Sequence, residues 1–162
     1  MTTIDDFSQQ KPLVRFSIYT LIQADSLQRV GQKLCSLSQG WPEDIKGGDL
    51  SEYYDLFWLW VLGSYEVLRT MDQHSSCFSV EKQTEIKDLK KKLHKIRIPF
   101  AKQELRGRGG PIDNENSIAN VSSGLRFVIE GQRFESCDLI HEVTSFLRSF
   151  APMDIRSSIP TR

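Results

Sequence analysis

Two short segments place an arginine near a side chain that could move a proton or bind an anion. The first is KIRIPFAKQE, in which Arg97, Lys102, Gln103 and Glu104 crowd the turn around Pro99. A planar guanidinium can hold a phosphate or a carboxylate with two parallel hydrogen bonds. This segment could therefore bind a phosphate or position a hydroxyl group. The structural alternative is a kinked basic helix with a solvent-exposed face.

The predicted binding set of this segment is Arg97, Lys102, Glu104 and Glu66. Proline removes one helical hydrogen bond and crowds the preceding turn, so we expect a kink or a break near Ile98. We expect Arg97 and Lys102 to lie on the same side of that kink. Glu66 and Glu104 are the first candidates for an acidic partner.

The second segment is LRTMDQH, in which Arg69 precedes His74. Histidine titrates nearer to neutral pH than any other side chain, so His74 is the best base available if the chain is a ribonuclease. The alternative is an ion pair between Arg69 and Glu66 across one helical turn, followed by a histidine that the helix dipole favours. The catalytic candidates are thus Arg97, Lys102, Arg69 and His74.

The first segment resembles the signature of HEPN-domain proteins, which are helical bundles with a motif that reads like R-N-x-x-A-H. Arg97, Ala101 and Lys102 stand at corresponding places, while Ile98 replaces the polar residue and Lys102 replaces the histidine. HEPN ribonucleases act on RNA with arginine and histidine from two subunits, and a lysine cannot replace histidine as a neutral-pH base. The resemblance implies a HEPN-like bundle over roughly residues 49–150, dimeric and without the usual base.

Most of the elements that position these residues are predicted to be helices, because their apolar residues recur at helical spacing. One predicted helix lies within residues 13–38, although residues 13–24 could also form a strand. A second begins at Asp49 or Ser51 and ends before His74, and a third begins near Ser79 and carries the lysines. A short β-hairpin follows over residues 125–135 with its turn at Gly131-Gln132, and a last helix covers residues 137–150.

The predicted fold is therefore mainly α, a bundle of three to four helices with one short β-hairpin before the last helix. We expect one domain over residues 13–150, with disordered tails at 1–12 and 151–162. No apolar run approaches the roughly 18 residues that span a bilayer, so we expect no membrane contact. The odd, scattered set of cysteines predicts free thiols and a cytoplasmic protein. Neither a metal site nor a cofactor motif is expected.

Charge and aromatic residues suggest two classes of partner. Residues 79–110 hold ten Lys and Arg against four Asp and Glu, whereas the chain as a whole has no net charge. That segment could bind RNA, or pair with the protein's own acidic part. In the second helix, Tyr54, Trp58 and Trp60 either fill the core or form an interface with a second copy, because aromatic residues are enriched in interfaces.

Two functions remain open from the sequence. The first is a non-enzymatic interaction protein, a homodimer that also binds other proteins. The second is an RNA-binding or RNA-cleaving HEPN-type protein of the toxin–antitoxin or defence kind, which as an enzyme would be a metal-independent ribonuclease. The two differ in whether the basic charges converge with Arg69 and His74 in one cleft.

Overall fold

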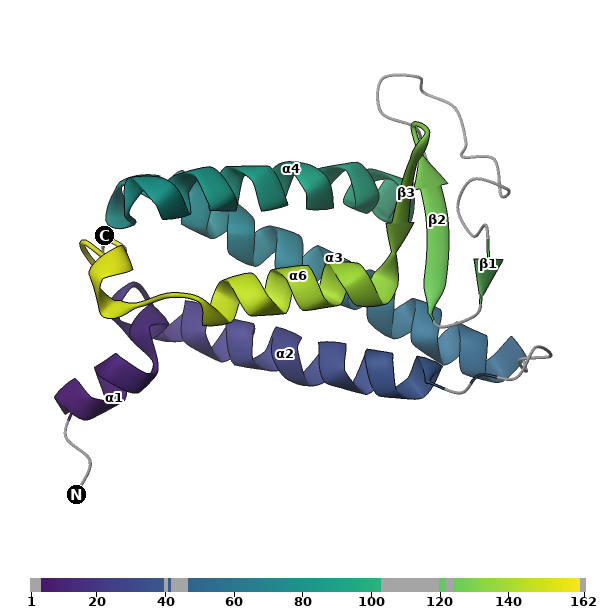
Figure 1. Ribbon diagram of the computed structural model, residues 1–162, viewed down its shortest axis with the longest axis horizontal. Coiled ribbons are helices and arrows are strands. Elements are labelled where there is room, and N and C mark those ends of the chain that lie inside the picture. Colours follow the sequence, from purple (N-terminus) through teal and green to yellow (C-terminus); the bar gives the residue numbers. More distant parts are fainter. Residues whose placement is uncertain (1–3, 40, 42–46, 103–119, 122–123, 161–162) are drawn as a thin grey trace.

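A computed structural model describes residues 4–39, 41, 47–102, 120–121 and 124–160 of the chain. Long helices pack side by side and a small antiparallel sheet stands at one end of them (Figure 1). The predicted fold class is confirmed: the chain is a helical bundle with a hairpin before the last helix. The elements are α1 Ile4–Gln10, η1 Pro12–Arg15, α2 Ile18–Ser38, α3 Gly47–Gln73, η2 Ser75–Cys77, α4 Val80–Lys102, β1 Asn120–Val121, β2 Leu125–Ile129, β3 Gln132–Glu135, α6 Ser136–Arg148 and η3 Pro152–Asp154.

Residues 13–24, for which helix and strand were both possible, are helical. Pro12 begins the short 3-10 helix η1, a position where its missing N–H costs nothing. Ser17 then caps α2, and its hydroxyl accepts a hydrogen bond from the Thr20 N–H at 3.4 Å. The cap fixes the first turn of α2, so that its apolar stripe faces the bundle.

The central helix α3 packs against α2 on one side and α4 on the other. Its polar stripe of Asp55, Glu66, Arg69 and Gln73 stays exposed, as its spacing indicates. Helix α4 runs through Pro99 to Lys102, so the break that we expected near Ile98 does not occur. Pro99 is itself buried, and the packing of α4 along α3 offsets the one hydrogen bond that the proline ring removes.

The hairpin turn lies one residue earlier than predicted. The turn residues are Glu130 and Gly131, with φ angles of 51° and 76°, and Gln132 already pairs with Ile129. Positive φ at both central residues is the geometry of a type I′ turn, whose twist matches that of the strands. A strand that we did not predict, β1, pairs with the other edge of β2.

Residues in both of the predicted tails have a described structure. Residues 4–10 form α1. At the other end, Ile155 is 8% exposed and forms a β-bridge with Phe78. The Ile159 N–H donates to the Phe16 carbonyl oxygen at 2.9 Å. These contacts hold the C-terminal segment beside η1 and the start of α4 (Figure 1). The apolar residues of the C-terminal segment are isolated and do not recur at a regular spacing, so the sequence pattern did not predict that the segment packs on the bundle.

Candidate functional site

Arg97 is held by an aromatic ring. Its guanidinium carbon lies 4.7 Å from the centre of the Tyr65 ring, and Tyr65 also contacts the His94 ring at 5.8 Å. A guanidinium stacked on an aromatic face is stabilised by the negative charge density of the ring. Arg97 is partly buried in this contact. The stack joins α4 to α3, which is a structural role.

Glu66 is not the partner of Arg97, and that part of the prediction is wrong. Glu66 binds Arg69 instead, with 2.7 Å between Arg69 Nη2 and Glu66 Oε2. The two residues are one turn apart on α3, where side chains three residues apart are neighbours. The side chain of Lys102 and the whole of Glu104 lie outside the described residues.

The side chain of Lys102 is not described, so three of the four catalytic candidates can be placed. His74 follows the last turn of α3, where its N–H donates to the Thr70 carbonyl oxygen at 3.2 Å, and its ring lies 6.5 Å from that of Phe16. Arg97 stacks on Tyr65, which precedes His74 by nine residues, or about 13 Å at 1.5 Å of rise per residue. Arg97 and His74 are therefore separated by about two and a half helical turns along α3.

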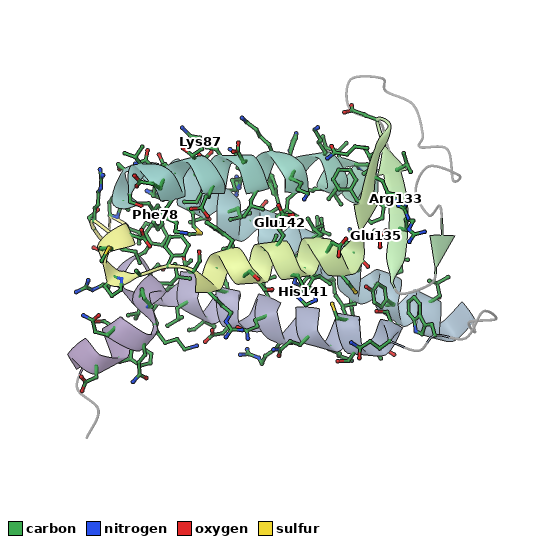
Figure 2. All side chains as sticks on the ribbon, in the orientation of Figure 1. Phe78, Lys87, Arg133, Glu135, His141 and Glu142 are labelled. Atoms are coloured by element: carbon green, nitrogen blue, oxygen red, sulfur yellow. The ribbon has the colours of Figure 1, made fainter. Side chains whose placement is uncertain are left out.

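The lysines of α4 are distributed around the helix and mostly paired with acids. Lys90 binds Asp72 of α3, and Lys92 binds Glu142 of α6. Figure 2 shows Lys87 on the outer side of α4, pointing away from the bundle, while Glu142 lies between α6 and α4. Within α4, the lysine–carboxylate pairs are Lys82–Glu85 and Lys91–Asp88. The basic segment thus satisfies much of its charge inside the protein.

A groove between α2 and α3 is lined mostly by apolar side chains. Its volume is about 320 Å³. Leu59 on its rim is 57% exposed, whereas Trp60 is only 1% exposed. The absent side chain of Gly63 deepens the groove, since a Cβ there would stand 3.3 Å from Leu27 Cδ2. The lining residues are Gln23, Ser26, Leu27, Val30, Leu56, Leu59, Trp60, Gly63, Glu66 and Val67.

The predicted interface trio divides between core and surface. Trp60 is a core residue at the base of the groove, and its indole N–H donates to the Leu27 carbonyl oxygen at 3.0 Å. Trp58 is 38% exposed and Tyr54 is half-buried, so these two offer more surface to a partner. Leu59 was missed although it lies between the two tryptophans. The sequence signal for Leu59 was its position one turn before Gly63, because a large apolar residue next to a glycine on one helix face can form part of an interface.

A buried polar cluster joins α3, β2 and α6, and sequence reasoning also missed it. The Tyr53 hydroxyl lies 2.6 Å from Ser136 Oγ, which accepts a hydrogen bond from the Leu125 N–H at 3.0 Å. Gly124 has φ +117°, and a Cβ there would come within 2.6 Å of the same Oγ. Burial raises the pKa of the Tyr53 hydroxyl, so it stays a neutral hydrogen-bonding group. The cluster positions the hairpin against the bundle.

The described residues form neither a candidate metal-binding cluster nor a membrane-spanning helix. Across the described ranges, no three His, Cys, Asp or Glu residues gather in a way that could hold a metal ion. No helix in that part of the chain has the length and apolar character needed to cross a bilayer. Compared with protein family models, with curated proteins and with solved structures, the chain matches none.

Proposed function

We propose that this chain is a non-enzymatic interaction domain that pairs with a second copy of itself through the groove between α2 and α3. The observation that carries the proposal is a groove with an apolar lining beside an apolar side chain, Leu59, that projects into solvent. An apolar helix face laid into an apolar groove is a common mode of protein recognition.

The arrangement on α3 suits a second copy because it is self-complementary. Leu59 and Gly63 lie one turn apart on the same side of the helix. In a two-fold pairing, Leu59 of each copy would fill the space over Gly63 of the other, and a closed dimer results. The same pattern could receive a helix of another protein that carries a leucine at the matching place.

The rim of the groove is polar, which also fits an interface. Gln23 and Ser26 line it on the α2 side, and Glu66 lines it on the α3 side with its charge paired to Arg69. Stable interfaces combine an apolar centre with a polar rim. Further exposed apolar residues on α2 are Ile18, Tyr19 and Ile22, with Tyr19 one turn before Gln23 on the groove side. They extend the surface that a partner could cover.

Light scattering on purified protein tests the pairing. We expect the unmodified chain to have the mass of a dimer at micromolar concentration and Leu59→Asp to have the mass of a monomer, because a carboxylate would be buried without a partner. Val80→Asp is the matched control: Val80 is 59% exposed and lies at the start of α4, away from the groove. A monomeric unmodified chain, or equal effects of both substitutions, would contradict the proposal.

The RNA alternative keeps a test of its own. It rests on the lysine-rich α4 and on the HEPN-like motif at Arg97, and the internal ion pairs of α4 give it less support than the groove gives to self-association. If the site is a decayed ribonuclease, Lys102→His restores the missing base and should produce cleavage in a gel assay. Absence of cleavage by a folded variant would remove the main support for a decayed ribonuclease. A reducing compartment, the cytoplasm, fits the free thiols in either case.

A further inference from the structure

Helices α2 and α6 approach each other closely at Gly31. A Cβ at this position would come within 2.6 Å of Ile140 Cγ2 and 3.7 Å of Thr144 Cγ2. The two helices run side by side along the bundle (Figure 1). One turn further along α2 lies Cys35, and nearly one turn before Ile140 on α6 lies Cys137. The close crossing therefore brings two thiols that are distant in sequence to the same place.

Ser38 and Tyr53 bring the two cysteines together. Ser38 Oγ donates to the Cys35 carbonyl oxygen at 3.2 Å and lies 3.5 Å from Cys137 Sγ. The Tyr53 hydroxyl lies 3.8 Å from the same sulfur. Burial, together with a side-chain hydrogen bond to Cys137, raises the pKa of Cys35 to about 12. Because this keeps Cys35 protonated, Cys137 is the sulfur that we expect to react first.

We propose that Cys35 and Cys137 are a peroxide-sensitive dithiol that closes to an intramolecular disulfide between α2 and α6. In the first step, the Cys137 thiolate attacks a peroxide oxygen: the O–O bond breaks, an S–O bond forms and the leaving oxygen takes up a proton. In the second step, Cys35 attacks the Cys137 sulfenic acid: an S–S bond forms, the S–O bond breaks and water leaves with the Cys35 proton. Hydrogen peroxide is reduced to two waters, and two thiols lose two electrons.

The third cysteine provides the contrast. Cys77 is 2% exposed, and its thiol donates to the Ser158 carbonyl oxygen at 3.5 Å. Cys35 and Cys137 are both partly exposed. Oxidation depends on access to the sulfur, so the pair should react before Cys77. The pair lies where α2 faces α6, whereas the groove lies where α2 faces α3, so this inference stands independently of the proposed function.

Peptide mapping of the whole, folded chain tests the proposal. Reduced protein is treated with hydrogen peroxide, alkylated with N-ethylmaleimide and digested with trypsin. We expect one cross-linked species that joins residues 34–46, which contain Cys35, to residues 134–148, which contain Cys137. The intact protein should lose two alkylation sites, regain them with dithiothreitol and melt at a higher temperature while cross-linked.

Variants separate the two thiols. Cys77→Ala should form the same cross-link, whereas Cys35→Ser should leave a sulfenic acid on Cys137 that dimedone traps. The proposal is overturned if both thiols stay open to alkylation under peroxide, if the disulfide joins two chains, if Cys77 is required, or if Cys35→Ser gives no dimedone adduct on Cys137. Each result is read on protein whose circular dichroism matches that of the unmodified chain.

Discussion

Alanine at two helical glycines should change stability in opposite directions. At Gly31 the new Cβ would lie 2.6 Å from Ile140 Cγ2, about 1 Å inside the contact distance of roughly 3.5–4.0 Å between carbon atoms. Ile140 is 2% exposed, and its Cγ2 is attached directly to Cβ, so the methyl group cannot move away without rotation of the whole side chain. Overpacking of this kind costs about 1–3 kcal/mol, against a gain of about 1 kcal/mol from the better helix former. Gly31→Ala should therefore lower the free energy of unfolding by up to about 2 kcal/mol.

Gly63→Ala is the matched comparison on α3. Its nearest contact is Leu27 Cδ2 at 3.3 Å, the end of a side chain that can turn into the groove. In the Leu59→Asp background, which the proposed pairing makes monomeric, the helix propensity gain should then dominate, and we expect stability to rise by about 0.5–1 kcal/mol. Urea unfolding measures both changes. In thermal unfolding, each kcal/mol corresponds to roughly 2–4 °C for a chain of this size.

A double-mutant cycle locates the cause. Ile140→Ala removes the methyl group that the new Cβ meets, so Gly31→Ala should cost less in that background than in the unmodified chain. If Gly31→Ala is as stable as Gly63→Ala, or if its cost is unchanged by Ile140→Ala, then α2 and α6 do not approach as described. In that case the close approach of α2 and α6 that places Cys35 near Cys137 would also be wrong.

Three further outcomes follow from the structure. Trp60→Ala should cost about 3–5 kcal/mol in urea unfolding, because it empties a fully buried site and removes the indole hydrogen bond to the Leu27 carbonyl oxygen; a cost under 1 kcal/mol would contradict its place in the core. The pKa of Cys35 is raised from its ordinary value of 9.0 to about 12, so its protonated thiol favours the folded state. This contribution to the free energy of unfolding is complete below pH 9 and is lost as the pH rises towards 12. Alkaline unfolding followed by circular dichroism should show that decline, reduced in Cys35→Ala. Arg97→Lys should lower stability by about 1 kcal/mol through loss of the Tyr65 stack and leave any RNA affinity unchanged; a selective loss of binding that steepens with salt would favour the RNA function.

The fold was largely predictable because local patterns determine it. Apolar residues at helical spacing located α2, α3, α4 and α6, and alternation located β2 and β3. The hairpin turn was misplaced by one residue, since Glu130 had to adopt a positive φ, which is uncommon for a non-glycine residue. The C-terminal segment was missed because it is held by backbone hydrogen bonds of Asp154, Arg156 and Ile159, which leave no periodic signal.

The candidate sites were harder to predict because they depend on distances between elements. Spacing alone suggested that Glu66 could serve either Arg69 or Arg97, and only the geometry shows that the local pair forms. The contact of Cys35 with Cys137 depends on a close helix crossing at Gly31. A glycine within a helix was the one available signal, because small residues allow helices to approach. The same signal, at Gly63, was available for the groove.

The most direct test of the central claim is an isotope-filtered NMR experiment on a mixture of labelled and unlabelled chains. Such a sample reports only contacts between different copies. If the chain pairs through the groove, the Leu59 methyl groups of one copy should show cross-relaxation with the Gly63 and Val67 protons of the other, and Leu59→Asp should abolish it. Contacts between copies at another surface, or no such contacts at concentrations where the chain is otherwise folded, would contradict the account.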